Sequence, residues 1–260
     1  MSIPIQLHRT PLSLDDRPLA ARIGLIILAT DHTTEPDFQR MVASDRVGVY
    51  VVRIPYANPV TPENLRRMQP SITAAAGLLL PDETLDAICY SCTSASVVIG
   101  DKEVEAAIQV AKPGVPVVTP PMAAMTGLRT LGARRISVLT PYTVETSEPM
   151  AAYFTAHGFD IASFTCLGLE DDREMARIPP SELVKAAVAA MARGAEALFI
   201  SCTALRAAVA AADIEEAIGK PVVTSNQATA WQCLRLSGDA SVRADAGRLF
   251  TLPLPAEARG

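Results

Sequence analysis

Two cysteines occupy the same local pattern and are the residues best suited to chemistry. Cys92 lies within residues 85–96 and Cys202 within residues 195–206, and in both segments Ser-Cys-Thr follows a short apolar run. Each pattern predicts a buried strand, a tight turn and the start of a helix. At such a turn, free N–H groups and the helix dipole favour thiolate over thiol. The sequence thus indicates two reactive thiols, although a single cysteine of this kind is more often a core residue.

The two cysteine segments belong to a longer internal repeat. Short motifs recur in the same order and at similar spacings: Arg-Ile at 22–23 and 135–136, Thr-Thr-Glu-Pro at 33–36 and Thr-Ser-Glu-Pro at 146–149, Ser-Cys-Thr at 91–93 and 201–203, and Pro-Val-Val-Thr at 116–119 and 221–224. This period is too long for a solenoid repeat. The chain is therefore predicted to contain a duplicated domain.

Apolar segments and helical segments alternate in each half. The segments predicted as strands in the first half are 22–28, 47–53, the run before Cys92, and 115–119. A helix is expected at 62–79, and a helical stretch is expected to run from Cys92 to Lys112. This alternation predicts an α/β fold with two parallel-sheet domains related by pseudo-twofold symmetry.

The repeat also suggests domain boundaries. Residues 1–119 and 226–260 are assigned to the N-terminal domain, and residues 120–225 to the C-terminal domain. Residues 1–20 contain three prolines and little periodicity, so we expect an arm before the first strand. A helix at 227–236 is expected to pack back across the second unit or onto the first.

Parallel sheets bind ligands beyond the carboxyl ends of their strands, which predicts where the functional side chains meet. Cys92 and Cys202 would approach one small substrate from opposite sides of a cleft between the domains. Tyr142 follows the first strand of the second unit, in the loop that mirrors the one containing Asp31. Its hydroxyl could face the substrate, or the ring could simply pack in the cleft.

Composition excludes several classes of function. With 49% hydrophobic and 20% charged residues, the chain is typical of a globular α/β protein. A net charge of −5 without a basic stripe argues against a nucleic-acid partner. No apolar run reaches membrane-spanning length, and the amino end is too short and polar for a signal peptide. Five scattered cysteines suit a reducing compartment, so a cytoplasmic protein is expected.

The motifs that hold cofactors are missing from the sequence. There is no P-loop, no G-x-G-x-x-G and no G-x-S-x-G, so we expect no cofactor. Cys89 and Cys92 match C-x-x-C, but no second pair or histidine stands at zinc spacing. His32 is the one histidine near the predicted site, where it could assist proton transfer or lie exposed on its loop.

Taken together, these segments resemble the Asp/Glu racemase superfamily, in the branch of maleate cis-trans isomerase and arylmalonate decarboxylase. The resemblance covers roughly residues 20 to 240. It rests on both Ser-Cys-Thr turns and on Arg-Ile-Gly-Leu-Ile at 22–26, Leu-Thr-Pro-Tyr at 139–142, Met-Ala-Arg-Ile at 175–178 and Pro-Val-Val-Thr-Ser-Asn-Gln at 221–227. It implies two Rossmann-like (flavodoxin-like) halves, an active site in the cleft between them, and cofactor-free chemistry. Cys92, Cys202 and Tyr142 match the family's catalytic positions.

The chain departs from each branch in one respect. The decarboxylases have glycine where Cys92 stands, so two thiols favour an isomerase or racemase. The maleate isomerases offer asparagines to a substrate carboxylate where Asp31 and Asp172 fall here. The resemblance therefore implies a substrate that bears an amino group or another donor. The pattern also resembles the ectoine-utilisation EutA subgroup, which would fit a diaminobutyrate-like ligand.

These observations lead to one expected function and two alternatives. The expected enzyme is a cofactor-independent isomerase or racemase that acts on a small carboxylic acid. Whether the chain forms a homo-oligomer is left open. Backbone N–H groups near Thr93, Ser94 and Thr203 would hold the developing enediolate. An arylmalonate-type decarboxylase is one alternative. The other is a non-enzymatic protein that binds a small acid, with the cysteines only lining its cleft.

Overall fold

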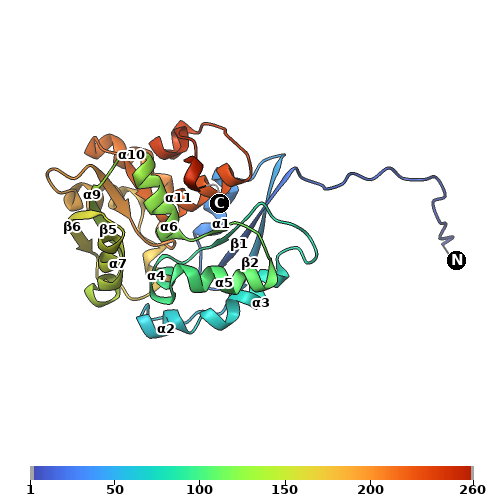
Figure 1. Ribbon diagram of the computed structural model, residues 1–260, viewed down its shortest axis with the longest axis horizontal. Coiled ribbons are helices and arrows are strands. Elements are labelled where there is room, and N and C mark those ends of the chain that lie inside the picture. Colours follow the sequence, from blue (N-terminus) through green and yellow to red (C-terminus); the bar gives the residue numbers. More distant parts are fainter. Residues whose placement is uncertain (1–2, 259–260) are drawn as a thin grey trace.

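The structure is a computed structural model that describes residues 3–258. It contains two four-stranded sheets in which every strand pair is parallel. The first sheet has the order β2-β1-β3-β4, and the second has the equivalent order β6-β5-β7-β8. The predicted fold of two parallel-sheet α/β domains is thereby confirmed. Figure 1 shows the first sheet on the side from which the N-terminal arm leaves and the second at the opposite end.

The strands fall close to the predicted segments. They are β1 (Ala21–Leu28), β2 (Val47–Ile54), β3 (Ala87–Tyr90), β4 (Val117–Val118), β5 (Arg135–Thr140), β6 (Asp160–Cys166), β7 (Ala197–Ile200) and β8 (Val222–Thr224). Every residue of β1, β3 and β7 is buried, as continuous apolar runs in covered parallel sheets should be. These central strands fix the positions of the loops that follow them.

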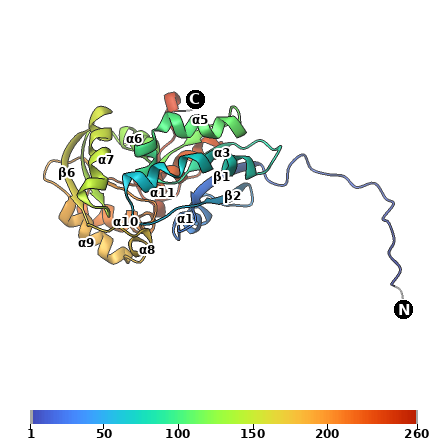
Figure 2. The same cartoon turned by 90° about the horizontal axis from the view of Figure 1, so that it is seen from below.

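Helices cover both sheets. They are α1 (Thr34–Met41), α2 (Pro62–Arg66), α3 (Gln69–Leu78), α4 (Thr93–Ile99), α5 (Asp101–Ala111), α6 (Pro120–Thr130), α7 (Val144–Ala156), α8 (Asp172–Met175), α9 (Pro180–Ala190), α10 (Ala207–Ile218) and α11 (Ser225–Leu236), followed by three short 3₁₀ turns. In both views α6 and α11 lie between the two sheets, and α7 and α9 flank the second sheet (Figures 1 and 2).

Two segments that the sequence pattern predicts as single helices are each divided into two helices. The segment 62–79 divides into α2 and α3, because Pro70 lies at the start of α3, where its missing N–H is tolerated. The stretch from Cys92 to Lys112 divides at Gly100, which has φ +106. That value is accessible to glycine and strained for other residues, so the chain turns there between α4 and α5.

The N-terminal arm and the last long helix differ in how they contact the rest of the chain. Residues 3–20 contain no helix or strand. Most of this arm projects from the body, and near its end Arg17 donates to Thr84, while positions 1–2 lie outside the described residues (Figure 1). Helix α11 packs against α1, α6 and β3, so the helix that follows the second unit contacts the first. The domain boundaries themselves remain a prediction, and residues 259–260 of the N-terminal assignment also lie outside the described part.

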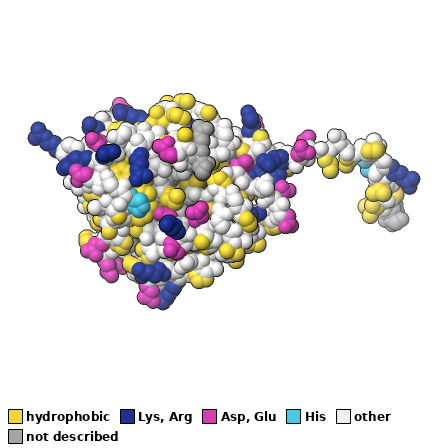
Figure 3. Space-filling view, viewed as in Figure 1, with side chains coloured by type: hydrophobic (Ala, Val, Ile, Leu, Met, Phe, Trp, Pro, Cys, Tyr) yellow, Lys and Arg dark blue, Asp and Glu magenta, His cyan; other side chains and the backbone are white. Residues whose placement is uncertain are grey.

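No helix within residues 3–258 is long and apolar enough to span a membrane. On the face shown in Figure 3, acidic and basic side chains are interspersed.

Candidate active site

A small cavity lies where the carboxyl ends of both sheets converge. Its volume is about 20 Å³, little more than the space that one water molecule needs. It is lined by Leu28, Asp31, Tyr56, Val60, Leu65, Cys92, Ser94, Tyr142, Asp172, Met175, Cys202, Thr203 and Ala204. Apart from Leu28, which ends β1, these residues follow β1, β2 and β3 of the first sheet and β5, β6 and β7 of the second. Both halves of the duplicated chain thus supply one cavity, as the strand pattern predicts.

Cys92 is placed by the end of β3. It is the residue before the first turn of α4, and its carbonyl accepts hydrogen bonds from the N–H and the hydroxyl of Ser96 at 3.0 and 2.8 Å. Its Sγ lies 3.9 Å from the hydroxyl of Ser94. The side chain is buried at 4% exposure and contributes its sulfur to the cavity.

Cys202 occupies the equivalent position after β7, but its backbone differs. Its φ is +98, a value that residues with a Cβ rarely adopt, and such strain persists where surrounding structure enforces it. The N–H of Cys202 donates to Ser225 Oγ at 3.1 Å, and its Sγ accepts from Ala204 N–H at 3.3 Å. Met175 Sδ lies 3.9 Å from the thiol. These contacts hold the sulfur at the cavity wall.

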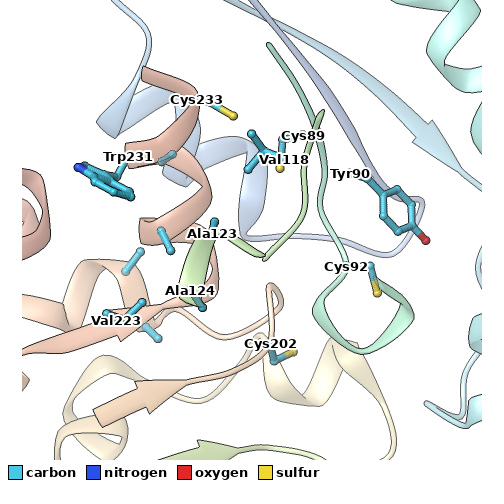
Figure 4. Packing of buried hydrophobic residues seen from close by; sticks show 14 of the residues in the cluster. Cys89, Tyr90, Cys92, Val118, Ala123, Ala124, Cys202, Val223, Trp231 and Cys233 are labelled. Carbon is cyan, nitrogen blue, oxygen red and sulfur yellow. The ribbon is translucent and has the colours of Figure 1, made fainter. Parts of the chain in front are cut away.

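The two Ser-Cys-Thr turns are tied to each other by hydrogen bonds. Thr203 Oγ1 donates to the carbonyl of Ser91 at 3.4 Å, and Thr93 Oγ1 lies 2.8 Å from the Ser225 hydroxyl that accepts from Cys202. Figure 4 shows Cys92 and Cys202 on turns that approach each other from the two halves. The duplication therefore places two thiols at one site.

The expectation that the helix dipole favours thiolates is wrong for this structure. Burial raises the pKa of Cys92 to about 12, although the Ala95 N–H and the Ser94 hydroxyl act in the opposite direction. Burial likewise raises the pKa of Cys202 to about 12, and contacts with Tyr142 and Ala204 offset this only in part. Loss of water around a sulfur anion outweighs these few donors, so both thiols are neutral near pH 7.

Tyr142 lies next to the Cys202 thiol. It is 3% exposed, and its hydroxyl lies beside both the Cys202 thiol and the Ser94 hydroxyl. Its backbone N–H donates to Thr140 Oγ1 at 3.1 Å, which fixes the turn after β5. Burial raises the pKa of the Tyr142 phenol well above its usual value, so the hydroxyl keeps its proton. Of the two interpretations of Tyr142, the structure shows the one in which the hydroxyl faces the site.

Asp31 lines the cavity and also caps a helix. One carboxylate oxygen accepts from the N–H groups of Thr33 and Thr34 at 2.7 and 2.8 Å, and the other accepts from Thr34 Oγ1 at 2.6 Å. Burial raises the pKa of Asp31, against the lowering effect of these donors and of Arg53. The capping alternative is thus present, and the carboxyl still borders the cavity.

The adjacent carboxylates of Asp171 and Asp172 have different surroundings in the structure. Asp172 is 5% exposed and lines the cavity, where Thr30 Oγ1 donates to one oxygen and Asn58 Nδ2 donates to the other at 2.8 Å. Asp171 caps α8 and pairs with Arg173, which holds the pKa of its carboxyl at about 2. Asp172 is therefore the carboxylate that a small molecule in the cavity would meet.

Three backbone N–H groups remain for an oxyanion. Within residues 3–258, the N–H groups of Thr93, Ser94 and Thr203 donate to no protein acceptor. Ser94 and Thr203 line the cavity, whereas the Thr93 side chain points toward Ser225. Thr93, which the sequence also suggested as a substrate-binding residue, is not among the residues that line the cavity.

Sequence reasoning missed Tyr56. It lies in the loop after the edge strand β2, where no spacing or motif marks it, and only the folded loop brings it to the cavity. Ser225 was part of the motif at 221–227, but its link to Cys202 depends on tertiary structure.

The remaining candidates lie elsewhere. Cys89 is buried and faces Cys233 rather than the cavity (Figure 4), and His32 is exposed and does not line the cavity. Among the described residues, no group of three His, Cys, Asp or Glu side chains could hold a metal ion.

Comparison with known proteins places these features in a family. The model of the arylmalonate decarboxylase family matches residues 58–250, which is most of the chain. Arylmalonate decarboxylase from Bordetella bronchiseptica is 34% identical over 140 residues, which are 53% of this chain and 58% of that protein. The match thus spans less than two thirds of that relative.

Two further similarities extend over nearly the whole chain. Maleate isomerase from Nocardia farcinica is 28% identical over 225 residues, covering 82% of this chain and 89% of that protein. A cysteine-to-serine mutant of the N. farcinica maleate cis-trans isomerase, solved with a covalently bound succinylcysteine intermediate, superposes with a TM-score of 0.80. That superposition has 25% identity and covers 88% of this chain and 98% of the other.

Proposed function

Because this chain belongs to the arylmalonate decarboxylase family, we propose that it is a cofactor-independent isomerase acting on a small carboxylic acid through Cys92 and Cys202. The observation that carries the proposal is the single cavity lined by two thiols and Tyr142. The maleate isomerases that resemble this chain support it, since one of them carries a succinylcysteine intermediate. The reaction is either racemisation or cis-trans isomerisation.

Two opposed thiols suit both reactions. In racemisation, one thiolate removes the α-proton, and the opposite thiol then delivers its own proton to the other face of the enediolate. In cis-trans isomerisation, a thiolate adds to the double bond, the new single bond rotates, and the thiolate leaves again. Because both thiols are neutral at rest, one of them must first give its proton to solvent when the substrate binds. From then on each cycle leaves one thiol and one thiolate, so no further proton and no electron is gained or lost.

The N–H groups of Thr93, Ser94 and Thr203 would stabilise the enediolate. They come from both Ser-Cys-Thr turns and have no protein acceptor within residues 3–258. Removing one preorganised oxyanion donor typically costs about 10²–10³ in rate. Tyr142, which keeps its proton, can donate to the same oxygens or to a Cys202 thiolate.

Charge in the cavity favours a substrate with an amino group. Asp31 and Asp172 both line the cavity, and no Lys, Arg or His among the described residues does. An ammonium group would pair with these carboxylates. It would also supply the positive charge that the buried thiols lack, and a nearby cation lowers the pKa of a thiol. The diaminobutyrate-like ligand of the EutA subgroup would meet this requirement and remains a prediction.

Decarboxylation is the second candidate function. It is favoured by the family model and by the similarity to the B. bronchiseptica decarboxylase. The second thiol, Cys92, favours isomerisation, because a decarboxylase needs to protonate only one face of its intermediate.

Proton-exchange NMR in D₂O tests the proposal. Small amino acids and dicarboxylic acids are incubated with the wild type, with Cys92→Ala and with Cys202→Ala. We expect the wild type to exchange or isomerise at least one acid, and each variant to lose turnover while keeping the wild-type circular dichroism spectrum. Full activity in either variant would refute the two-thiol mechanism.

Three other outcomes distinguish the alternatives. Release of carbon dioxide from phenylmalonate without racemisation of any acid would favour the decarboxylase. Binding of an acid without any reaction would favour a non-enzymatic binding protein. Loss of activity after dialysis against EDTA would show that a metal takes part.

A further inference from the structure

Among the cavity-lining side chains, Tyr56 has a buried hydroxyl with no hydrogen-bond partner within residues 3–258. Tyr56 lines the same cavity as the two thiols, Tyr142 and Asp172. Its oxygen is buried, yet no donor or acceptor among residues 3–258 reaches it. A buried polar group is normally hydrogen-bonded, and an exception in a native site calls for an explanation.

The loop that carries Tyr56 is fixed by contacts with the other half of the chain. Asn58 Nδ2 donates to Asp171 and Asp172 at 3.0 and 2.8 Å. The N–H of Val60 donates to the carbonyl of Glu170 at 2.8 Å, and the carbonyl of Val60 accepts from Thr146 Oγ1 at 2.9 Å. The segment that follows Tyr56 is therefore held against the second half of the chain by hydrogen bonds.

The Tyr56 hydroxyl acts as a donor. Burial, and the nearby Cys92, Asp172 and Cys202, raise the pKa of the phenol, so its proton stays in place. The nearest carboxylate, Asp172, already accepts from Thr30 and Asn58. A molecule in the cavity is thus the available source of an acceptor.

The enediolate site lies on different loops. The N–H groups proposed to hold the reacting carboxylate follow β3 and β7, whereas Tyr56 follows the edge strand β2. Tyr56 can therefore contact a part of the substrate other than its reacting carboxylate.

We propose that Tyr56 is a specificity-determining residue that donates a hydrogen bond to an oxygen in the distal part of the substrate. This inference rests on the proposed function. It narrows the substrate class to amino-bearing acids with a hydroxyl, amide or acyl oxygen beyond the α-carbon. A site built around such a donor discriminates against an analogue that lacks the oxygen, because its own buried group is then left unpaired.

Calorimetry with matched acids tests the assignment. The probes are homoserine against norvaline and asparagine against leucine, pairs of similar shape in which only the first member has a distal oxygen. We expect the wild type to bind the oxygen-bearing member of at least one pair about tenfold tighter, and Tyr56→Phe to reduce this ratio to about twofold or less.

Tyr90→Phe is the matched control. Tyr90 also has a buried hydroxyl without a partner, but it lies within β3 and does not line the cavity (Figure 4). This variant should keep the wild-type ratio. Thermal unfolding of both variants establishes that each is folded before the ratios are compared.

Several outcomes would overturn the assignment: equal affinities for both members of each pair in the wild type, an unchanged ratio in folded Tyr56→Phe, or no binding of any probe. Proton exchange of the same acids is measured separately. Binding ratios as expected without exchange would refute the proposed isomerase and leave the role of Tyr56 intact. Proton exchange of these acids without a difference in affinity within the pairs would refute the role of Tyr56 and leave the proposed isomerase intact.

Discussion

Replacing Asp31 by asparagine tests how the cavity selects charge. Asparagine keeps the size of the side chain, and its amide oxygen can still accept from the N–H groups of Thr33 and Thr34. Thr34 Oγ1, which now donates to the second carboxylate oxygen at 2.6 Å, can rotate to accept from the new amide nitrogen. The cap of α1 is thus preserved, and the main change is the loss of one negative charge.

The size of the effect follows from Coulomb attraction and repulsion. Two unit charges about 4 Å apart interact with about 4 kcal/mol at an effective dielectric near 20. A substrate carboxylate beside Asp31 would meet this repulsion, less the part offset by the capping N–H groups and by Arg53. A free-energy difference of about 1.4 kcal/mol changes the affinity tenfold. Even a third of the full Coulomb repulsion would therefore be measurable as a change in affinity. We expect Asp31→Asn to bind maleate at least about tenfold tighter than the wild type, and an amino-bearing acid correspondingly more weakly.

Isothermal titration of maleate and of homoserine into both proteins measures the two shifts. Asp171→Asn is the control, because it removes a nearby negative charge that does not line the cavity and leaves a residue suited to capping α8. The control should leave both affinities within about twofold of the wild type. Tight binding of maleate by the wild type, with no change in either affinity in Asp31→Asn, would refute charge selectivity and leave Asp31 with its capping role alone.

Three further predictions concern the thiols and the chemistry. In a Cys166→Ser background, which removes the partly exposed cysteine, alkylation of Cys92 and Cys202 by iodoacetamide should be slow at pH 7. It should accelerate about tenfold per pH unit on the way to their pKa of about 12, whereas a plateau near pH 8 would show that the thiols are activated. Cys202→Gly should unfold with about 1 kcal/mol more free energy than Cys202→Ala, since glycine adopts φ +98 without strain, and equal denaturant midpoints would contradict this. Exhaustive dialysis against EDTA should leave turnover unchanged, and stoichiometric zinc that is needed for turnover would contradict the cofactor-free mechanism.

Much of the fold follows from local patterns in the sequence. Continuous apolar runs such as 22–28 can bury both faces only in a covered parallel sheet, and the structure shows Ala21–Leu28 buried along its length. The repeated Ser-Cys-Thr turns indicated two equivalent sites. Because the carboxyl ends of parallel strands face the same way, this was enough to predict that Cys92, Cys202 and Tyr142 meet. The helix breaks at Pro70 and Gly100 were also readable locally, from residues that end or start helices.

The properties of the site depend on contacts that no local pattern contains. Local reasoning gave Cys92 a helix N-terminus and hence a lowered pKa, but burial of the thiol in the folded chain raises its pKa. Asp172 accepts from Thr30, a residue more than a hundred positions earlier, whereas Asp171 pairs with Arg173 at the start of α8. Tyr56 enters the cavity because its loop is bound to residues 146 and 170 of the other half.

Strand and turn patterns therefore determined which loops converge, because period and apolar length are local properties of the chain. Solvation and hydrogen-bond partners are shared among residues from distant segments. Whether a thiol is ionised, which carboxylate faces a ligand and which hydroxyl is left without an acceptor were decided only when the two halves packed together.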